Sequence, residues 1–417
     1  MEIKRDIYLN KLIARQNNGL IKIVTGLRRS GKSYLLFKLF RSYLARSGVD
    51  EKHIITAVLD DRDSRDLRDP DIMLYYIKSR IADTEMYYIL LDEVQLLGDF
   101  EEVLNSLLHL EAVDIYVTGS NSKFLSSDVI TEFRGRGDEV RIHPLNFREF
   151  TSVYEGTKEE AWDDYFQYGG LPLVLSQRSS SAKAEYLSHL FENVYLADII
   201  ERHKVRNDEE LGELVNILAS SIGSFTNPLK LSKTFKSVKN KTISDKTLKK
   251  YIDYISDAFL IEKAQRFDLK GKRYINSLAK YYFEDIGLRN ARLNFRQTEE
   301  NHIMENIIYN ELRSRGYHVD VGVMDSYGTN AENTTFRKRL EVDFIATLGS
   351  EKYYIQSAFS VSDPDKLQQE QGVFLHIGDS FKKIIVVREN IKPRRDENGI
   401  TTLGLYNFLL DENSLRI

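Results

Sequence analysis

Eight consecutive residues near the start of the sequence have the types and spacing of a loop that binds phosphate groups. They follow a β-branched run and precede a helical pattern, and with the next residue they form the expected contact set: Gly26, Leu27, Arg28, Arg29, Ser30, Gly31, Lys32, Ser33 and Tyr34. The two glycines let the backbone curl, so that amide N–H groups and the N-terminus of the next helix face an anion. Lys32 then reaches the β- and γ-phosphates, and Ser33 offers its hydroxyl to Mg²⁺. The loop predicts binding of a nucleoside triphosphate.

Two neighbouring carboxylates, Asp92 and Glu93, stand at the end of an apolar run farther along the chain. Such a pair often only caps a helix, and a glycine-rich turn is sometimes only a tight connection. Here the pair follows Lys32 by sixty residues, with one strand candidate at 54–60 in between, and this order favours a shared nucleotide site. We expect Asp92 to hold Mg²⁺ and Glu93 to polarise the attacking water. No base-selective NKxD motif occurs, so the expected nucleotide is ATP, with GTP left open.

Short apolar runs alternate with helical patterns from residue 20 to about residue 150, which is typical of an α/β fold with a parallel sheet. The five predicted strands are 21–25, 54–60, 87–92, 114–119 and 139–143. Asp92 and Glu93 then lie at the rim where open parallel sheets bind ligands. We therefore predict a P-loop NTPase core over residues 1–150.

Two further modules follow the predicted core. Helical patterns dominate 151–225 and predict a helical lid. The segment 226–295 has the order helix, turn, helix, hairpin, with Ser244 as the N-cap of the second helix, and predicts a winged-helix module. Eight lysines and a single aspartate lie between residues 228 and 250, which makes duplex DNA a candidate partner. Alternatively, the lysines only form a solvated helical face without a ligand, since winged-helix modules also serve only as connectors between domains.

The last predicted module, 296–417, begins with a helix and continues with three strands, a helix and a strand. The three strands are expected at 317–324, 338–349 and 352–360, and the second helix at 363–375. This is the core order of restriction-endonuclease-like domains, and the module is a candidate surface for a protein partner. The polar segment 325–337 between the first two strands predicts a loop.

Composition restricts the classes of protein to which the chain can belong. Of the 417 residues, 42% are hydrophobic and 29% charged, and no apolar run approaches the roughly 20 residues that span a bilayer. The absence of cysteine excludes disulfides and thiolate metal sites, and it fits a cytoplasmic location. The eight histidines show no ligand spacing, so the only metal inferred is Mg²⁺ held with the nucleotide. With a net charge of −4, any contact with nucleic acid must use a local basic patch.

Three stretches together resemble a known family. They are TGLRRSGKS, then LLDEVQ with VTGSNS and FRGRGDEVRIHPLNFREF, and finally EVDFIA with YYIQSAFS. Over nearly its full length the chain is similar to prokaryotic AAA-type ATPases whose C-terminal part is a domain of unknown function with a nuclease-like fold. The resemblance implies a polar sensor at Ser120 or Asn121. It also implies an arginine finger at Arg136, with Arg134 as the alternative, and a finger supplied by a neighbouring subunit implies a homo-oligomer.

The C-terminal module departs from the pattern of active nucleases of this fold. Those enzymes carry an acid on the second core strand and an acid-x-lysine on the third. Here Asp343 supplies the first acid, but the third strand has Gln356 and Ala358 where the other two groups belong. Because Mg²⁺ prefers anionic oxygen ligands, one carboxylate and an amide make a poor metal site. We expect a nuclease-like domain that cuts nothing, in which Glu305 and Asp343 are buried and paired.

The sequence as a whole predicts an ATP-hydrolysing AAA-type switch or motor that acts on DNA or on a protein partner, without membrane contact. The expected catalytic residues are Glu93, Lys32, Arg136 and Asn121, and the expected Mg²⁺ ligands are Ser33 and Asp92. Two alternatives stay open. The first is a DNA-binding regulator that uses nucleotide as a slow switch, and the second is an ATP-dependent nuclease.

Overall fold

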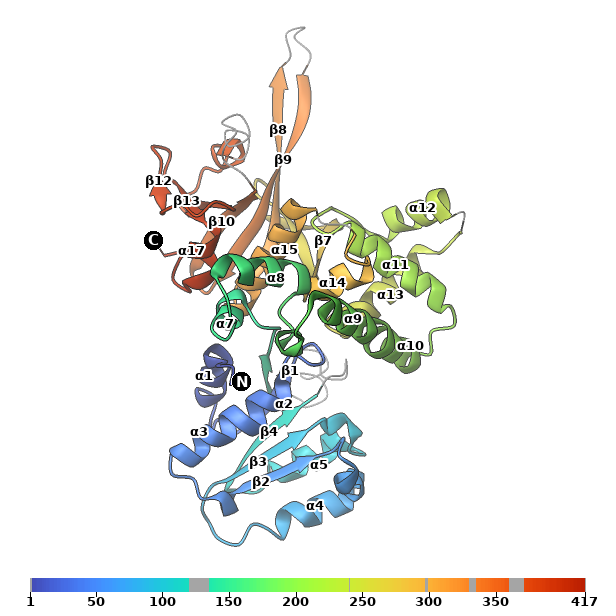
Figure 1. Ribbon diagram of the computed structural model, residues 1–417, viewed down its shortest axis with the longest axis vertical. Coiled ribbons are helices and arrows are strands. Elements are labelled where there is room, and N and C mark those ends of the chain that lie inside the picture. Colours follow the sequence, from blue (N-terminus) through green and yellow to red (C-terminus); the bar gives the residue numbers. More distant parts are fainter. Residues whose placement is uncertain are drawn as a thin grey trace. The chain divides into compact units, whose positions relative to one another are not determined.

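The parallel sheet expected near the N-terminus forms the centre of the first of two units (Figure 1). The computed structural model describes residues 2–119, 135–239, 241–296, 299–329, 335–359 and 371–416. The first unit comprises Met1–Pro144 with Asp257–Phe259, and the second comprises Leu145–Ser256 with Leu260–Ile417. Among the described residues, no helix is both long enough and apolar enough to cross a bilayer.

The sheet of the first unit has five parallel strands in the order β2-β3-β4-β1-β5. Their bounds are β1 Ile21–Thr25, β2 Ile54–Val58, β3 Tyr87–Asp92, β4 Val113–Thr118 and β5 Gly137–Arg141. The predicted limits of β1 and β3 are confirmed, as is the α/β fold with a parallel sheet. β5 begins and ends two residues earlier than predicted, because it pairs with the whole of β1, from Ile21 opposite Gly137 to Thr25 opposite Arg141.

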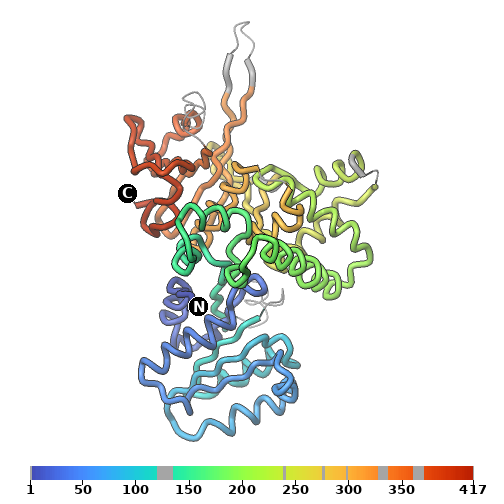
Figure 2. The backbone as a smooth tube through the Cα atoms, viewed as in Figure 1, coloured from blue at the N-terminus to red at the C-terminus, as the bar shows by residue number. Residues whose placement is uncertain are grey.

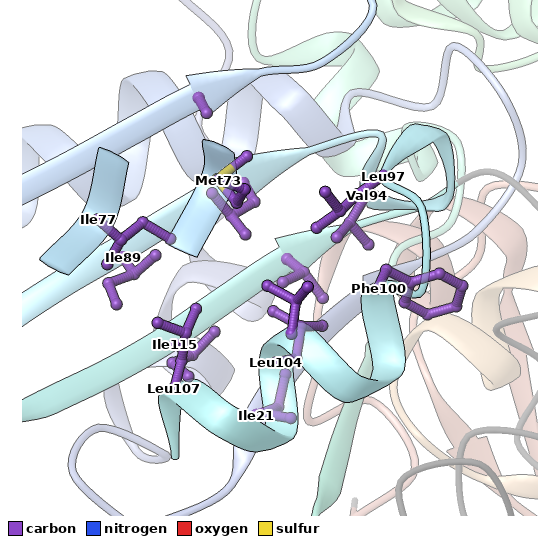
Figure 3. Packing of buried hydrophobic residues seen from close by; sticks show 14 of the residues in the cluster. Ile21, Met73, Ile77, Ile89, Val94, Leu97, Phe100, Leu104, Leu107 and Ile115 are labelled. Atoms are coloured by element: carbon purple, nitrogen blue, oxygen red, sulfur yellow. The ribbon is translucent and has the colours of Figure 1, made fainter. Parts of the chain in front are cut away.

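Helices cover both faces of this sheet, because alternate residues of a buried strand point to opposite sides. Ile89 and Leu91 of β3 pack with α4 and α5, whereas Tyr88 and Leu90 pack with α1 and the helix that follows β1. Figure 3 shows the first of these clusters, in which Met73 and Ile77 of α4 lie near Ile89. The helical elements are α1 Asp6–Ile13, α2 Lys32–Tyr34, the π-helical stretch η1 Leu35–Phe40, α3 Arg41–Arg46, η2 Glu51–His53, η3 Arg62–Arg68, α4 Pro70–Lys78, η4 Val94–Leu96 and α5 Phe100–Leu107.

The second unit begins with the helices predicted for 151–225. They are α7 Phe147–Thr151, α8 Lys158–Tyr168, η6 Pro172–Ser176, α9 Ser180–Leu190, η7 Phe191–Leu196, α10 Ala197–His203 and α11 Asp208–Ser220. The chain reverses at Gly169 and Gly170, where the Asp285 carboxylate accepts a hydrogen bond from the Gly170 N–H at 2.7 Å. A Cβ on Gly170 would lie 2.1 Å from the Leu145 carbonyl oxygen, so only glycine fits there. The helical character of this segment is confirmed, and its role as a lid stays a prediction.

The order helix, helix, hairpin is present in the next segment. α12 covers Pro228–Lys239, α13 Asp245–Asp257, β6 Ile261–Asp268 and β7 Arg273–Phe283. The hydroxyl of Ser244 accepts a hydrogen bond from the Thr247 N–H at 3.0 Å, which confirms the predicted N-cap. The hairpin differs from the expectation, because β7 is longer than predicted and both strands belong to a larger sheet. The winged-helix assignment stays a prediction.

That larger sheet has eight strands in the order β12-β13-β11-β10-β9-β8-β6-β7. The remaining bounds are β8 His318–Thr329, β9 Thr335–Leu348, β10 Glu351–Ala358, β11 Lys382–Val387, β12 Arg394–Arg395 and β13 Ile400–Gly404, with helices α14 Ile286–Arg292, α15 Glu300–Ser314 and α17 Leu405–Leu410. Figure 2 shows the orange part of the β8–β9 hairpin extending beyond the neighbouring strands. The sheet joins the two predicted modules, since β6 pairs in parallel with β8, Asp268 opposite Val323.

Two expectations for the C-terminal module need correction. The predicted loop at 325–337 is in large part strand, because Asp325 pairs with Arg339 and the ladder continues to Thr329 opposite Thr335. The short strands β12 and β13 and helix α17 were not predicted at all. Most of the helix expected at 363–375 lies outside the described residues.

Candidate nucleotide site

The loop from Gly26 to Gly31 follows β1 at the carboxyl end of the sheet, and its backbone requires both glycines. Gly26 has φ +132°, and a Cβ at that position would lie 2.1 Å from the carbonyl oxygen of Ile142. Gly31 has φ +100° and stands immediately before α2, which continues without a break through η1 into α3. Arg29 also lies in the left-handed region, with φ 65°. The loop therefore has the sharply curved backbone that directs amide groups at an anion.

An arginine far away in the sequence supports this loop. The guanidinium of Arg5, which is 2% exposed, donates to the Ser30 carbonyl at 3.0 Å and to the His143 carbonyl at 2.6 Å. Arg5 thereby ties the phosphate loop to the segment after β5. Sequence reasoning missed Arg5, because both contacts join residues distant along the chain and no local pattern marks them.

Lys32 is the cation at the centre of the site. Its ammonium donates to the carbonyl oxygens of Gly26 and Leu27, both at 3.1 Å, and the residue is 4% exposed. Burial lowers the pKa of Lys32 to about 8, although the negative charges of Glu93 and Asp92 partly oppose that shift. Among the described residues its hydrogen-bond partners are these two carbonyl oxygens, so an anionic ligand would stabilise the buried ammonium strongly.

The two expected Mg²⁺ ligands lie together. The hydroxyl of Ser33 donates to Oδ1 of Asp92 at 3.0 Å, and the hydroxyl of Thr118, at the end of β4, donates to the same oxygen. Burial raises the pKa of Asp92, and these two hydrogen bonds counteract part of the shift. Thr118 was missed, although the sequence contains a usable signal: it ends the strand beside β3, in the run VTGSNS.

Glu93 stands next to Asp92 in a left-handed conformation with φ 49°. Its N–H donates to the Thr118 hydroxyl at 3.1 Å, and its carboxylate accepts a hydrogen bond from the Gln95 side-chain amide. Glu93 is half-buried, so its carboxylate stays within reach of solvent. Thr118 therefore links the two carboxylate residues and fixes their relative position.

The remaining residues of the expected contact set divide into buried and exposed ones. Leu27 and Ser30 are buried, whereas Arg28 and Arg29 are exposed. Tyr34 accepts a hydrogen bond from the Ile3 N–H at 3.1 Å, so its hydroxyl contacts the N-terminal segment. The structure thus places Lys32, Ser33, Asp92 and Glu93 together, and the two arginines lie exposed on the same loop.

Arg136 does not join this group within one chain. Its carbonyl accepts from the Ile21 N–H at 2.8 Å, at the amino end of β1, and its Nη1 donates to Asn105 Oδ1 at 3.3 Å. Lys32 follows the other end of the same strand, whose five residues span roughly 13 Å from first to last Cα at about 3.3 Å per residue. Ser120, Asn121 and Arg134 lie outside the described residues.

A second group of charged side chains lies in the second unit, around Lys280 of β7. Its ammonium is within 2.7 Å of the carboxylates of Glu305 and Glu341 and within 3.7 Å of Asp343. Tyr282 donates to the same Glu305 oxygen at 2.6 Å. Burial lowers the pKa of Lys280, but the attraction of Glu305, Asp343 and Glu341 outweighs it and raises the pKa well above its usual range.

The expectation that Glu305 and Asp343 are buried and paired is confirmed, and the partner that they share is Lys280. Burial and the nearby charge of Glu305 raise the pKa of Asp343, while burial of Glu305 is outweighed by Lys280, which lowers its pKa. Gln356 accepts a hydrogen bond from the Asp343 N–H at 3.2 Å, and the Ser357 N–H donates to the Asp343 carboxylate at 2.9 Å. Within the described part of the chain, no cluster of three His, Cys, Asp or Glu residues is arranged to hold a metal ion.

Two relatives match the chain over most of its length. An uncharacterized protein of Haemophilus influenzae is 32% identical over 98% of this chain and 98% of its own length. An uncharacterized protein of Methanocaldococcus jannaschii is 30% identical over 87% of this chain and 79% of its own length.

Family models and solved structures add two findings. Residues 18–151 match an AAA domain, and residues 159–299 match a domain of unknown function, DUF8612. The ORC1 protein of Aeropyrum pernix, solved in complex with DNA, is 12% identical over 73% of this chain and 94% of that chain, with a TM-score of 0.33. At that score the likeness carries no conclusion for this chain. The sequence matches establish that this protein belongs to one family with the two uncharacterized relatives and carries an AAA domain, built on a five-stranded parallel sheet, at residues 18–151.

Proposed function

We propose that the first unit binds ATP with Mg²⁺ and hydrolyses it. The observation that carries this proposal is the meeting of the phosphate loop with the end of β3, where Ser33 Oγ lies 3.0 Å from Asp92 Oδ1 beside the buried Lys32. A hydroxyl and a carboxylate oxygen suit the hard-ligand preference of Mg²⁺, so these two side chains would hold the ion. The match to an AAA domain supports the same activity.

The surroundings of each residue support a distinct role. The ammonium of Lys32 would offset negative charge on the β- and γ-phosphates, because it is buried and its hydrogen-bond partners in the described part of the chain are carbonyl oxygens. The half-buried carboxylate of Glu93 would orient the attacking water, since Thr118 and Gln95 fix its position. Mg²⁺, when bound, supplies further neutralisation of phosphate charge. Phosphoryl transfer then depends mainly on positioning and electrostatics.

Steady-state phosphate release tests this proposal. We expect Mg²⁺-dependent hydrolysis of ATP by the wild-type protein, with GTP run in parallel, and complete loss of hydrolysis with weakened ATP binding in Lys32→Ala. The matched control is Lys38→Ala, because Lys38 is an exposed lysine on the same continuous helix. Normal turnover in a folded Lys32→Ala protein would contradict the assignment.

We further propose that Arg136 acts on the nucleotide of a neighbouring copy of the chain. Support comes from its place at the amino end of β1 and β5, opposite to the edge that carries Lys32. Arg136→Ala is expected to lower hydrolysis by at least roughly 10³-fold while ATP affinity stays nearly unchanged, because a finger acts on charge that develops in the transition state.

Mixing experiments separate this role from a structural one. Arg136→Ala and Glu93→Gln proteins, each inactive alone, are expected to regain part of the activity when combined, since a mixed interface joins an intact Glu93 to an intact Arg136. The rate of hydrolysis per molecule of wild-type protein should then rise with protein concentration. A mixture as inactive as its components would exclude action between copies.

We propose duplex DNA as the partner on which hydrolysis acts, through α13. Its buried residues, Leu248 and Ile252 among them, face the interior, whereas Lys246, Lys249 and Lys250 are exposed. These lysines equally support the second candidate, a DNA-binding regulator with little turnover. Hydrolysis assayed with and without duplex DNA distinguishes the motor from the regulator. DNA is expected to accelerate ATP hydrolysis by a motor, whereas a slow switch is expected to retain its nucleotide. A protein partner for the C-terminal module remains part of the proposal.

An ATP-dependent nuclease is the candidate function that the contacts in the second unit support least. The ammonium of Lys280 lies among the carboxylates of Glu305, Glu341 and Asp343, in the position where cleavage would need a divalent cation. To this group of charges the third strand, β10, contributes the amide of Gln356, whereas the carboxylate of its first residue, Glu351, pairs with Arg416.

A further inference from the structure

Basic side chains gather on the β8–β9 hairpin, on β6 and β7 and in the turn that joins these two strands, apart from the lysines of α13. The members of this group, here called the hairpin patch, are Arg266, Lys270, Arg273, Arg337 and Arg339. Among the described residues, the carboxylates that form ion pairs with them are Asp268 and Asp325. The patch therefore carries an excess of three positive charges in a chain whose net charge is −4.

The strand register brings these residues to one place. Asp325 lies opposite Arg339 on the hairpin, and Arg337 shares the face of Arg339 because side chains two residues apart on a strand point the same way. Arg337 forms an ion pair with Asp325, and Arg339 Nε lies 3.9 Å from the same carboxylate. Lys270, in the turn between β6 and β7, donates to the Asp325 carbonyl at 2.8 Å. The turn and the hairpin thus form one continuous basic surface.

Arg266 gives an independent indication of an anionic ligand. The residue is 8% exposed, and its buried Nε has no hydrogen-bond partner among the described residues. Burial lowers its pKa, and the positive charge of Arg339 lowers it further. An unpartnered guanidinium N–H beside exposed arginines is a costly arrangement that phosphate oxygens would relieve, since arginine binds phosphate through paired donors.

We propose that the hairpin patch binds the phosphodiester backbone of duplex DNA, as a second contact besides α13. Arg337 and Arg339 keep 56% and 46% of their side chains exposed, so they can reach a ligand while still paired. The distal hairpin extends beyond the neighbouring strands, as Figure 1 shows, and a two-stranded ribbon fits the major groove. The inference rests on the proposed DNA partner and not on the proposed hydrolysis of ATP.

Salt-dependent binding of a fluorescently labelled duplex oligonucleotide tests the proposal. The variant is Arg337→Ala with Arg339→Ala, and the matched control is Arg394→Ala with Arg395→Ala, which removes two exposed arginines from β12 in the same unit. Each lost phosphate contact lowers the slope of log affinity against log salt by about 0.9. We therefore expect the patch variant to lose about two units of slope and the control variant to keep the slope of the wild type.

The triple variant Lys246→Ala, Lys249→Ala and Lys250→Ala completes the comparison, with an expected loss of about two to three units of slope from α13. Unchanged slope in the patch variant, or an equal loss in the control, would overturn the hairpin patch as a DNA contact. Phosphate release without DNA, measured on the same preparations, keeps the two proposals apart. Hydrolysis in a protein that binds no DNA would refute both proposed DNA contacts, α13 and the hairpin patch, and leave the ATPase activity standing, whereas DNA binding without hydrolysis would refute only the proposed ATPase activity.

Discussion

The two units each contain a buried lysine, and the surroundings of these lysines differ. Lys32 is 4% exposed and contacts the carbonyl oxygens of its own loop, and burial lowers its pKa to about 8. Lys280 is 3% exposed and contacts two carboxylates at 2.7 Å, which raise its pKa well above the usual range. Similar burial thus produces pKa shifts of opposite sign.

The difference in charge compensation indicates which of the two buried lysines belongs to a ligand-binding site. The chain supplies full compensation for Lys280, so that lysine joins β7 to α15 and β9 as part of the folded structure. Lys32 lacks such close compensation, and a polyphosphate would supply it. A buried charge that the chain leaves under-compensated is therefore a stronger indication of a binding site than burial alone.

The largest effect is expected when each lysine is replaced by methionine. Lys280→Met leaves the buried Glu305 and its neighbours without a counter-charge, and we expect the free energy of unfolding to fall by about 3–5 kcal/mol. Lys32→Met removes a poorly compensated charge, and we expect stability to stay within about 1 kcal/mol of the wild type or to rise. Chemical denaturation of the two variants gives both values.

A rescue variant sharpens this result. Adding Glu305→Gln to Lys280→Met is expected to recover part of the lost stability, because the uncompensated charge is removed as well. If Lys280→Met and Lys32→Met lowered the free energy of unfolding equally, the different surroundings of the two lysines would have no effect on stability.

The next effect concerns the chemistry beside Lys32. Glu93→Gln keeps the size of the side chain but removes the negative charge that polarises water, so hydrolysis is expected to fall by at least about 10²-fold while ATP still binds. Nucleotide binding and phosphate release, measured on the same preparation, separate the two steps. Gln95→Ala is a suitable comparison, because it removes only the neighbour that holds the carboxylate. Normal hydrolysis in Glu93→Gln would place the base elsewhere.

The smallest effect is a pH dependence of ATP affinity. Below about pH 8 the ammonium of Lys32 is already charged in the free protein, whereas above that pH binding must first take up a proton. We expect affinity to fall as the pH rises above about 8, by up to about tenfold per pH unit. Calorimetry should show proton uptake on binding at about pH 9 and none at about pH 7. A flat profile would mean that Lys32 keeps its proton without ligand.

Local sequence patterns predicted the parts of the site that depend on neighbouring residues. The phosphate loop, the end of β3 and the cap at Ser244 were all predictable, because spacing along the chain determines them. Arg5 and Thr118 were not, since each acts through a contact with a residue on another element. Lys280 was missed for the same reason. Its carboxylate partners lie on α15 and β9, and nothing near Lys280 in the sequence marks it as their counter-charge.

The sequence predicted that the C-terminal module contains strands, but not how far the strands extend. The polar residues of 325–337 suggested a loop, yet a hairpin that projects from its sheet needs no apolar face, so polarity does not prevent pairing there. The module boundary predicted between 295 and 296 illustrates a related limit. The predicted order of elements places a boundary at that point, whereas hydrogen bonds between β6 and β8 cross it.

The pairing of β6 with β8 also determines how the second unit can be divided. Separating 226–295 from 296–417 would expose the edge of β6 on one fragment and the edge of β8 on the other. Unpaired strand edges of this kind recruit other chains and promote aggregation. Because Phe267 and Gly322 face each other across that seam, the fragments are expected to be insoluble apart and to recombine when expressed together.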